Sequence, residues 1–135
     1  MDDQKLYFLN PPDLASPNGF SHIAVNQRDK VVFISGQVAY NKLAETVGKN
    51  CLATQTDQAL QNIRTALNFI GLGFTNVIEF TFYVVNLNTE AATLIRDVRR
   101  KHLSPEHLPA STMVGVASLA KSDLLIEIKA QAVIP

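Results

Sequence analysis

The hydrophobic period of this sequence changes from two residues to about 3.6 residues and back, twice, and this order constrains the fold more than any other feature. Period-two or β-branched apolar runs predict strands, and apolar residues recurring every three or four positions predict helices. The predicted strands cover residues 5–9, 21–25, 31–35, 77–85, 112–116 and 124–134. One predicted helix covers residues 52–70 and ends at Gly71, and another begins at Asn88 or Thr89. The predicted order is β-β-β-α-β-α-β-β.

This order predicts a two-layer α+β fold, in which both helices cover one face of a mixed β-sheet. We expect residues 1–135 to form one domain, because neither a linker nor an internal repeat divides the chain. Strand residues assigned to one side of the fourth strand are Ile78, Phe80, Phe82 and Val84. Polar residues assigned to the outer face of the first helix are Gln55, Asp57, Gln58, Gln61, Asn62 and Arg64.

The second face of the predicted sheet mixes polar and apolar side chains. Along the last strand, Glu127, Lys129 and Gln131 alternate with the residues that face the helices. A sheet face that is neither fully polar nor fully apolar usually contacts a partner subunit. The sequence therefore predicts self-association.

Charge and cysteine content restrict the function further. Lys and Arg number 12, as do Asp and Glu, so the chain lacks the basic excess typical of nucleic-acid binders. A basic cluster at residues 96–101 lies late in the second predicted helix, where cations suit the helix dipole, and an RNA contact there is a minor alternative. Cys51 is the one cysteine, and the three histidines lack ligand spacing, so we expect no metal and no cofactor. With no apolar leader and no membrane-length apolar run, we expect a cytoplasmic protein.

Three motifs, taken in order and spacing, resemble one known family. They are the strand-ending Ser-Gly-Gln at residues 35–37, the strand and Asn-capped helix at residues 83–88, and Pro-Ala-Ser-Thr at residues 109–112 followed by Ile-Glu-Ile at residues 126–128. Together with the helix at 52–70, they resemble the reactive intermediate deaminase family, RidA/YjgF, also named endoribonuclease L-PSP. The resemblance extends from about Gly19 to Val133.

The resemblance implies a chorismate-mutase-like fold assembled as a homotrimer, with clefts at the subunit interfaces that bind small carboxylates. It implies that Glu127 positions the water that attacks an enamine or imine. It further implies that the cleft is lined by Phe20, His22, Ser35, Asn88, Ser111 and Thr112.

One departure from the family pattern affects the ligand. Where the deaminases have Pro-Ala-Arg-Ser, this chain has Pro-Ala-Ser-Thr, so Ser111 replaces the Arg that pairs with the ligand carboxylate. A guanidinium offers a charged fork of donors, whereas a hydroxyl offers one donor and no charge. The sequence therefore predicts a poor deaminase of 2-aminoacrylate-type substrates, with a ligand that is neutral or is held by His22 or another cation.

Three functions remain open at this point. The first is an imine or enamine hydrolase that uses Glu127, and the second is a protein that binds or senses a metabolite without catalysis. The third, an endoribonuclease, rests on the older family name and the basic cluster. Both Glu127 and His22 also have a purely structural interpretation, as an interface carboxylate and as a loop histidine bonded to backbone.

Overall fold

The computed structural model describes residues 5–135. Within them the chain forms six strands, two α-helices and one short 3-10 turn. In chain order these are β1 (Leu6–Leu9), β2 (Ile23–Asn26), β3 (Val31–Gln37), α1 (Leu52–Phe69), η1 (Phe74–Asn76), β4 (Val77–Val85), α2 (Thr89–Arg100), β5 (Ala110–Val116) and β6 (Ile126–Val133). The predicted order of strands and helices is confirmed.

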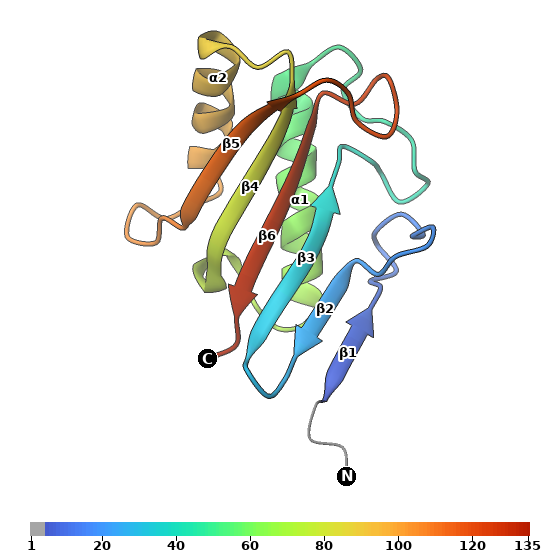
Figure 1. The fold of residues 1–135 in the computed structure, drawn as a ribbon, viewed down its shortest axis with the longest axis vertical. Coiled ribbons are helices and arrows are strands. Elements are labelled where there is room, and N and C mark those ends of the chain that lie inside the picture. Colours follow the sequence, from blue (N-terminus) through green and yellow to red (C-terminus); the bar gives the residue numbers. More distant parts are fainter. Residues whose placement is uncertain (1–4) are drawn as a thin grey trace.

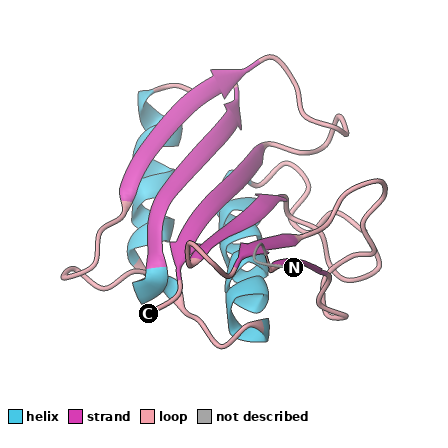
Figure 2. Cartoon of the chain, turned by 60° about the horizontal axis from the view of Figure 1, so that its bottom comes forward, coloured by secondary structure: helices cyan, strands magenta, loops and turns pink. Residues whose placement is uncertain are grey.

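The strands form one mixed sheet in the order β1-β2-β3-β6-β4-β5. Neighbouring strands are antiparallel except β4 and β5, which are parallel and are connected through α2. Both helices lie on the same side of the sheet (Figures 1 and 2). The predicted two-layer α+β fold is confirmed, and β1 and β5 are the edge strands.

The core lies between the helices and the inner face of the sheet. Inner-face residues of β6 alternate with outward residues, and Ile126, Ile128 and Ala132 are fully buried. Leu60, Ile63 and Leu67 of α1 pack against this layer. Gly71 follows the C-cap residue of α1, Ile70, and has a φ of +77°, which glycine adopts without steric cost. Neither helix of residues 5–135 is long and apolar enough to cross a membrane.

Two polar residues assigned from the sequence to the outer face of α1 are buried instead. The Gln55 amide donates to the carbonyls of Gly48 (3.2 Å) and Asp123 (2.9 Å), and it accepts from the Leu125 N–H (2.9 Å). The Asn62 amide donates to the carbonyls of Val38 and Tyr40, both at 2.9 Å. The prediction was wrong because these amides form hydrogen bonds with backbone groups of loops that are distant in sequence. The helical period of a sequence gives no information about such long-range partners.

Ile78 was also assigned to the wrong face. The pairing of β4 with β6 shifts register between Val77 and Glu79, and Ile78 is 45% exposed while Phe80 and Phe82 are buried. A bulge inserts one residue into the alternation and turns that side chain outward.

Candidate functional site

A cavity of about 450 Å³ lies where the loop before β2 meets the end of β3. Phe20 and His22 form part of its wall, and their rings meet edge to face with centroids 5.3 Å apart. Gly36 and Gln37, at the end of β3, form another part. The loop and the strand end therefore enclose the cavity between them.

An irregularity in β3 shapes this region. Its pairing with β6 shifts register between Ile34 and Gln37, so Ser35 and Gly36 form a bulge. The Ser35 hydroxyl donates to the Ser21 carbonyl (2.6 Å), and the Ser35 N–H donates to the His22 carbonyl (2.9 Å). Ser35 thus fixes the bulge against the loop, and Gly36 is left without a side chain beside the cavity.

Glu127 lies directly against this bulge. Its strand position pairs with Tyr83 of β4, which places Glu127 on the sheet face away from the helices. A Cβ at Gly36 would overlap the Glu127 carboxylate, so glycine is the residue that fits there. Burial raises the pKa of the Glu127 carboxyl. Among residues 5–135 no Lys, Arg or His nitrogen comes within 4.0 Å of this carboxylate. A half-buried carboxylate without a cation is typical of functional sites.

His22 uses both ring nitrogens within the protein. Nε2 lies 2.7 Å from the Ala15 carbonyl and is therefore assigned the proton, while Nδ1 accepts from the Gln37 amide at 3.0 Å. The ring is buried, with 6% of the residue exposed. His22 lines the cavity, and its ring nitrogens hold the loop to β3.

The remaining predicted ligand residues lie elsewhere in the chain. Asn88 caps α2, because its Oδ1 accepts from the Ala91 N–H (2.8 Å). Ser111 and Thr112 lie at the beginning of the edge strand β5 and are exposed. Ser111 faces the helix layer, where its Oγ accepts from the Arg99 guanidinium (3.1 Å), whereas Thr112 faces the opposite side, as Glu127 does.

The structure therefore divides the predicted site residues into groups. Phe20, His22, Ser35 and Glu127 gather around the β3 bulge. Ser111 pairs with Phe80 near one end of the parallel strands β4 and β5, whereas Asn88 follows the other end, where Val85 pairs with Val116. Five residues of strand separate these ends, which is roughly 16 Å. One chain does not bring all the predicted residues into one cavity.

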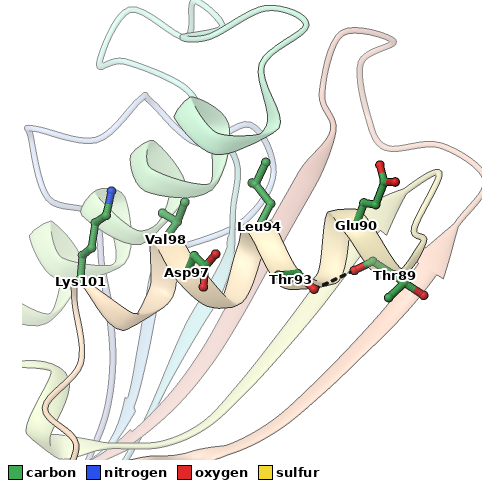
Figure 3. Close-up of a pocket in the computed structure, with 7 residues that line it drawn as sticks. All are labelled: Thr89, Glu90, Thr93, Leu94, Asp97, Val98 and Lys101. Carbon is green, nitrogen blue, oxygen red and sulfur yellow. Dashed lines mark hydrogen bonds between the residues drawn. The ribbon is translucent and has the colours of Figure 1, made fainter.

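A second pocket, of about 460 Å³, lies along α2 and is lined by none of the predicted catalytic or ligand-binding residues (Figure 3). Within it the Thr93 hydroxyl donates to the Thr89 carbonyl (3.0 Å). Across residues 5–135 there is no group of three or more His, Cys, Asp or Glu side chains able to hold a metal ion.

Sequence reasoning missed two residues of this region. Gly36 was read only as part of a motif, although its lack of a Cβ makes room for Glu127. Arg99 was read as part of a basic cluster, although its guanidinium reaches Ser111. No local pattern reports the Arg99 contact, because it joins a residue of α2 to a residue of β5.

These features define a class: a two-layer α+β protein whose bulged strand holds a half-buried carboxylate beside a cavity of small-molecule size. The chain belongs to the endoribonuclease L-PSP family, whose model matches residues 12–134. The resemblance to the RidA/YjgF family that the motifs indicate is confirmed.

Two relatives and one solved structure illustrate the similarity. The chain is 34% identical over 99 residues to the RutC family protein PH0854 of Pyrococcus horikoshii, covering 73% of this chain and 75% of the relative. It is 30% identical over 105 residues to the 2-iminobutanoate/2-iminopropanoate deaminase of Capra hircus, covering 78% and 74%. The crystal structure of YyfA from Yersinia pestis, a Rid-family protein of unknown function, superposes with a TM-score of 0.86 at 23% identity, covering 96% of this chain and 99% of that one. The structural likeness supports the fold.

Proposed function

We propose that this protein is a hydrolytic deaminase of small imines or enamines, and that Glu127 is its catalytic residue. The observation that carries the proposal is the Glu127 carboxylate, half-buried against the β3 bulge, with its pKa raised by burial. A carboxyl whose pKa is moved toward neutrality is suited to exchange a proton with a bound water. The named activity of the similar Capra hircus protein, deamination of 2-iminobutanoate and 2-iminopropanoate, supports this reaction class.

The proposed reaction balances with water alone. The substrate enters as the protonated imine, and Glu127 accepts a proton from the attacking water as the C–O bond forms, which gives a neutral carbinolamine. Glu127 then gives this proton to the amine nitrogen. The C–N bond breaks as the hydroxyl proton of the carbinolamine returns to Glu127 and passes to the departing ammonia. The products are a carbonyl compound and ammonium. The Phe20 ring, which is 49% exposed, would cover the apolar part of the ligand.

We further propose that the working unit is a homotrimer with its clefts at subunit interfaces. Within one chain Glu127 and Ser111 lie on opposite faces of the sheet. Strand β5 is an exposed edge strand of seven residues. The unpaired backbone N–H and C=O groups of an edge strand can form hydrogen bonds with another chain. Phe33 and Val114 are 42% and 38% exposed on the face that carries Glu127. A second copy placed against this face and edge would bring Thr112, and with it the end of β5 that carries Ser111, toward Glu127 of another subunit.

Light scattering tests the assembly. We expect a mass of about three times 14.8 kDa at micromolar concentration. A monomer would remove the interface cleft from the proposal.

Enzyme assay tests the chemistry. 2-Iminobutanoate can be generated in place from 2-aminobutanoate by an amino-acid oxidase, and its hydrolysis can be followed with and without the protein. We expect faster release of 2-oxobutanoate and ammonia, and loss of the acceleration in Glu127→Gln. Saturable binding of 2-oxobutanoate without any acceleration would instead support the alternative function, a metabolite-binding protein that is not an enzyme.

A further inference from the structure

The cavity beside the β3 bulge is larger than a small aliphatic imine needs. Its volume of about 450 Å³ is typical of pockets that enclose a whole organic ligand. At roughly 30 Å³ for each non-hydrogen atom, the volume of a water molecule in the liquid, it has room for about fifteen such atoms, whereas 2-iminobutanoate has about seven. A substrate that fills the cavity therefore carries a larger group on its imine carbon.

The buried polar side chains of the cavity wall already have hydrogen-bond partners. The Asn62 amide donates to backbone carbonyls and accepts from Gln58 (3.0 Å). The Gln37 amide donates to His22 Nδ1, and His22 Nε2 is bonded to the Ala15 carbonyl. Three further polar side chains of the wall are exposed, namely Ser16, Asn18 and Lys121. Because the donors of the buried side chains are engaged, the wall favours an apolar group.

Rings in the wall favour an aromatic group over an aliphatic one. Phe20 and His22 form an edge-to-face pair, and Tyr40 is a third ring in the wall. The Lys121 ammonium lies 4.8 Å from the centre of the Tyr40 ring, and no carboxylate oxygen among residues 5–135 lies within 4.0 Å of this ammonium. Aromatic rings attract one another and cations more strongly than alkyl groups of the same area do.

Gly36 connects this cavity to the proposed catalytic carboxylate. It lines the cavity, and the Glu127 carboxylate occupies the place where a Cβ of residue 36 would stand. One glycine, without a side chain, therefore lies next to both. A substrate whose imine carbon lies at Glu127 would extend its larger substituent past Gly36 and against Phe20.

We propose that the substrate is an imine with an aromatic side chain, which the cavity holds, and that Tyr40 and Lys121 determine this specificity. The inference rests on the proposed function and deepens it, because it names the substrate class of the same site. A benzyl group on the imine carbon gives 2-imino-3-phenylpropanoate, whose roughly twelve non-hydrogen atoms fit the volume. Tyr40 supplies an aromatic contact, and Lys121 supplies a positive charge beside the rings.

Three imines that differ only in their side chains test the substrate class. An amino-acid oxidase generates them in place from 2-aminobutanoate, phenylalanine and cyclohexylalanine, and spontaneous hydrolysis is subtracted. We expect kcat/KM to be at least about tenfold higher for the phenyl imine than for 2-iminobutanoate, because hydrophobic pockets discriminate by such factors. The cyclohexyl imine, which is as bulky but has no π electrons, should be about two- to fivefold poorer than the phenyl imine.

Variants of the wall test the role of Tyr40. Tyr40→Ala should lower the ratio of kcat/KM for the phenyl imine to that for 2-iminobutanoate by about 10- to 100-fold, whereas Tyr40→Phe, which keeps the ring, should retain this ratio. Tyr7→Ala is the matched control, because Tyr7 is an exposed tyrosine of β1 outside the cavity wall. Ala120→Phe, which adds a ring to the wall and reduces the volume, should also lower the ratio.

Lys121→Met tests the cation, since methionine keeps the apolar stem and removes the charge. This variant should abolish the preference for the phenyl imine over the cyclohexyl imine. A loss that is equal for these two imines would overturn the role of Lys121.

The outcomes separate this inference from the proposed function. Glu127-dependent hydrolysis of 2-iminobutanoate, with no preference for the phenyl imine and no effect of Tyr40→Ala on the ratio, would overturn the inference and leave the proposed function standing. Binding of 2-oxo-3-phenylpropanoate that depends on Tyr40, without hydrolysis of any of the imines, would overturn the proposed function and support the aromatic assignment of the cavity.

Discussion

Ionisable groups at the junction between α1 and α2 are paired, whereas Glu127 and Arg99, which lie on opposite sides of the sheet, have no partner of opposite charge among residues 5–135. At the junction, His102 Nε2 lies 2.7 Å from Asp57 Oδ1, and Arg64 donates to His102 Nδ1 at 3.0 Å. Every member of this cluster therefore has a partner. Glu127 has no cation and Arg99 has no carboxylate among residues 5–135, although both are half-buried.

The pKa values of the two carboxyls reflect this contrast. Burial tends to raise the pKa of Asp57, but hydrogen bonds from His102 and Gln61 outweigh burial and lower it. Burial raises the pKa of Glu127 with no opposing hydrogen bond. Paired groups stabilise a fold, whereas an unpaired group costs stability unless a ligand completes it. The paired groups of the junction stabilise the fold, and the unpaired carboxyl of Glu127 supports the proposal that this residue acts on a ligand.

The largest expected effect comes from removing the charge of Glu127. Glu127→Gln should lower kcat/KM for imine hydrolysis by about 100- to 10,000-fold, because the general base is lost while the shape is kept. The measurement is the in-place imine assay. Glu79→Gln, an exposed change on strand β4, is the matched control and should leave the rate unchanged. Equal rates for the two variants would show that Glu127 contributes no more to catalysis than the exposed carboxylate of Glu79.

A methyl group added at Gly36 should lower activity by displacing the Glu127 carboxylate. The added Cβ of Gly36→Ala overlaps the Glu127 carboxylate and must push this flexible group aside. We expect about a 100-fold loss of kcat/KM, the order of effect that follows from misplacing a catalytic group by 1 Å, with only a small loss of stability. Gly73→Ala is the control, since its Cβ would meet nothing within 4 Å. If the free energy of unfolding fell enough to account for the lost activity, Gly36 would instead have a structural role.

The junction should show the opposite behaviour. His102→Ala removes a side chain that is 8% exposed and takes away one of the two side-chain hydrogen bonds to Asp57, the other being that from Gln61. We expect the free energy of unfolding to fall by about 1–3 kcal/mol, with kcat/KM at low temperature nearly unchanged. Chemical denaturation measures the loss, and the exposed His107→Ala is the control. A large loss of activity with intact stability would move the junction into the functional region.

The sequence predicted the element types because each strand and helix follows its own hydrophobic period. It could not predict the placement of Gln55 and Asn62, whose partners are backbone groups of loops distant in sequence. Nor could alternation predict the bulge at Ile78, where one residue interrupts the pairing of β4 with β6. The candidate site residues were predicted from family motifs, and the contact between Arg99 and Ser111 was missed because the two residues belong to different elements.

The smallest expected effect is the pH dependence of stability, and its sign separates the two carboxyls. The pKa of Glu127 is raised on folding, so the folded state holds this proton more tightly than the unfolded chain. The ionised form is therefore destabilising above the folded pKa, and the penalty fades as the pH falls toward the ordinary glutamate value of 4.5. Asp57 behaves inversely, because its lowered pKa contributes stability that is lost only as the pH falls below about 3.8. Thermal unfolding of the wild type and Glu127→Gln from pH 8 to pH 4 should show the variant more stable at high pH and the two converging toward pH 4. Parallel curves would mean that Glu127 titrates alike in the folded and unfolded chains, and the contrast with Asp57 would then rest on geometry alone.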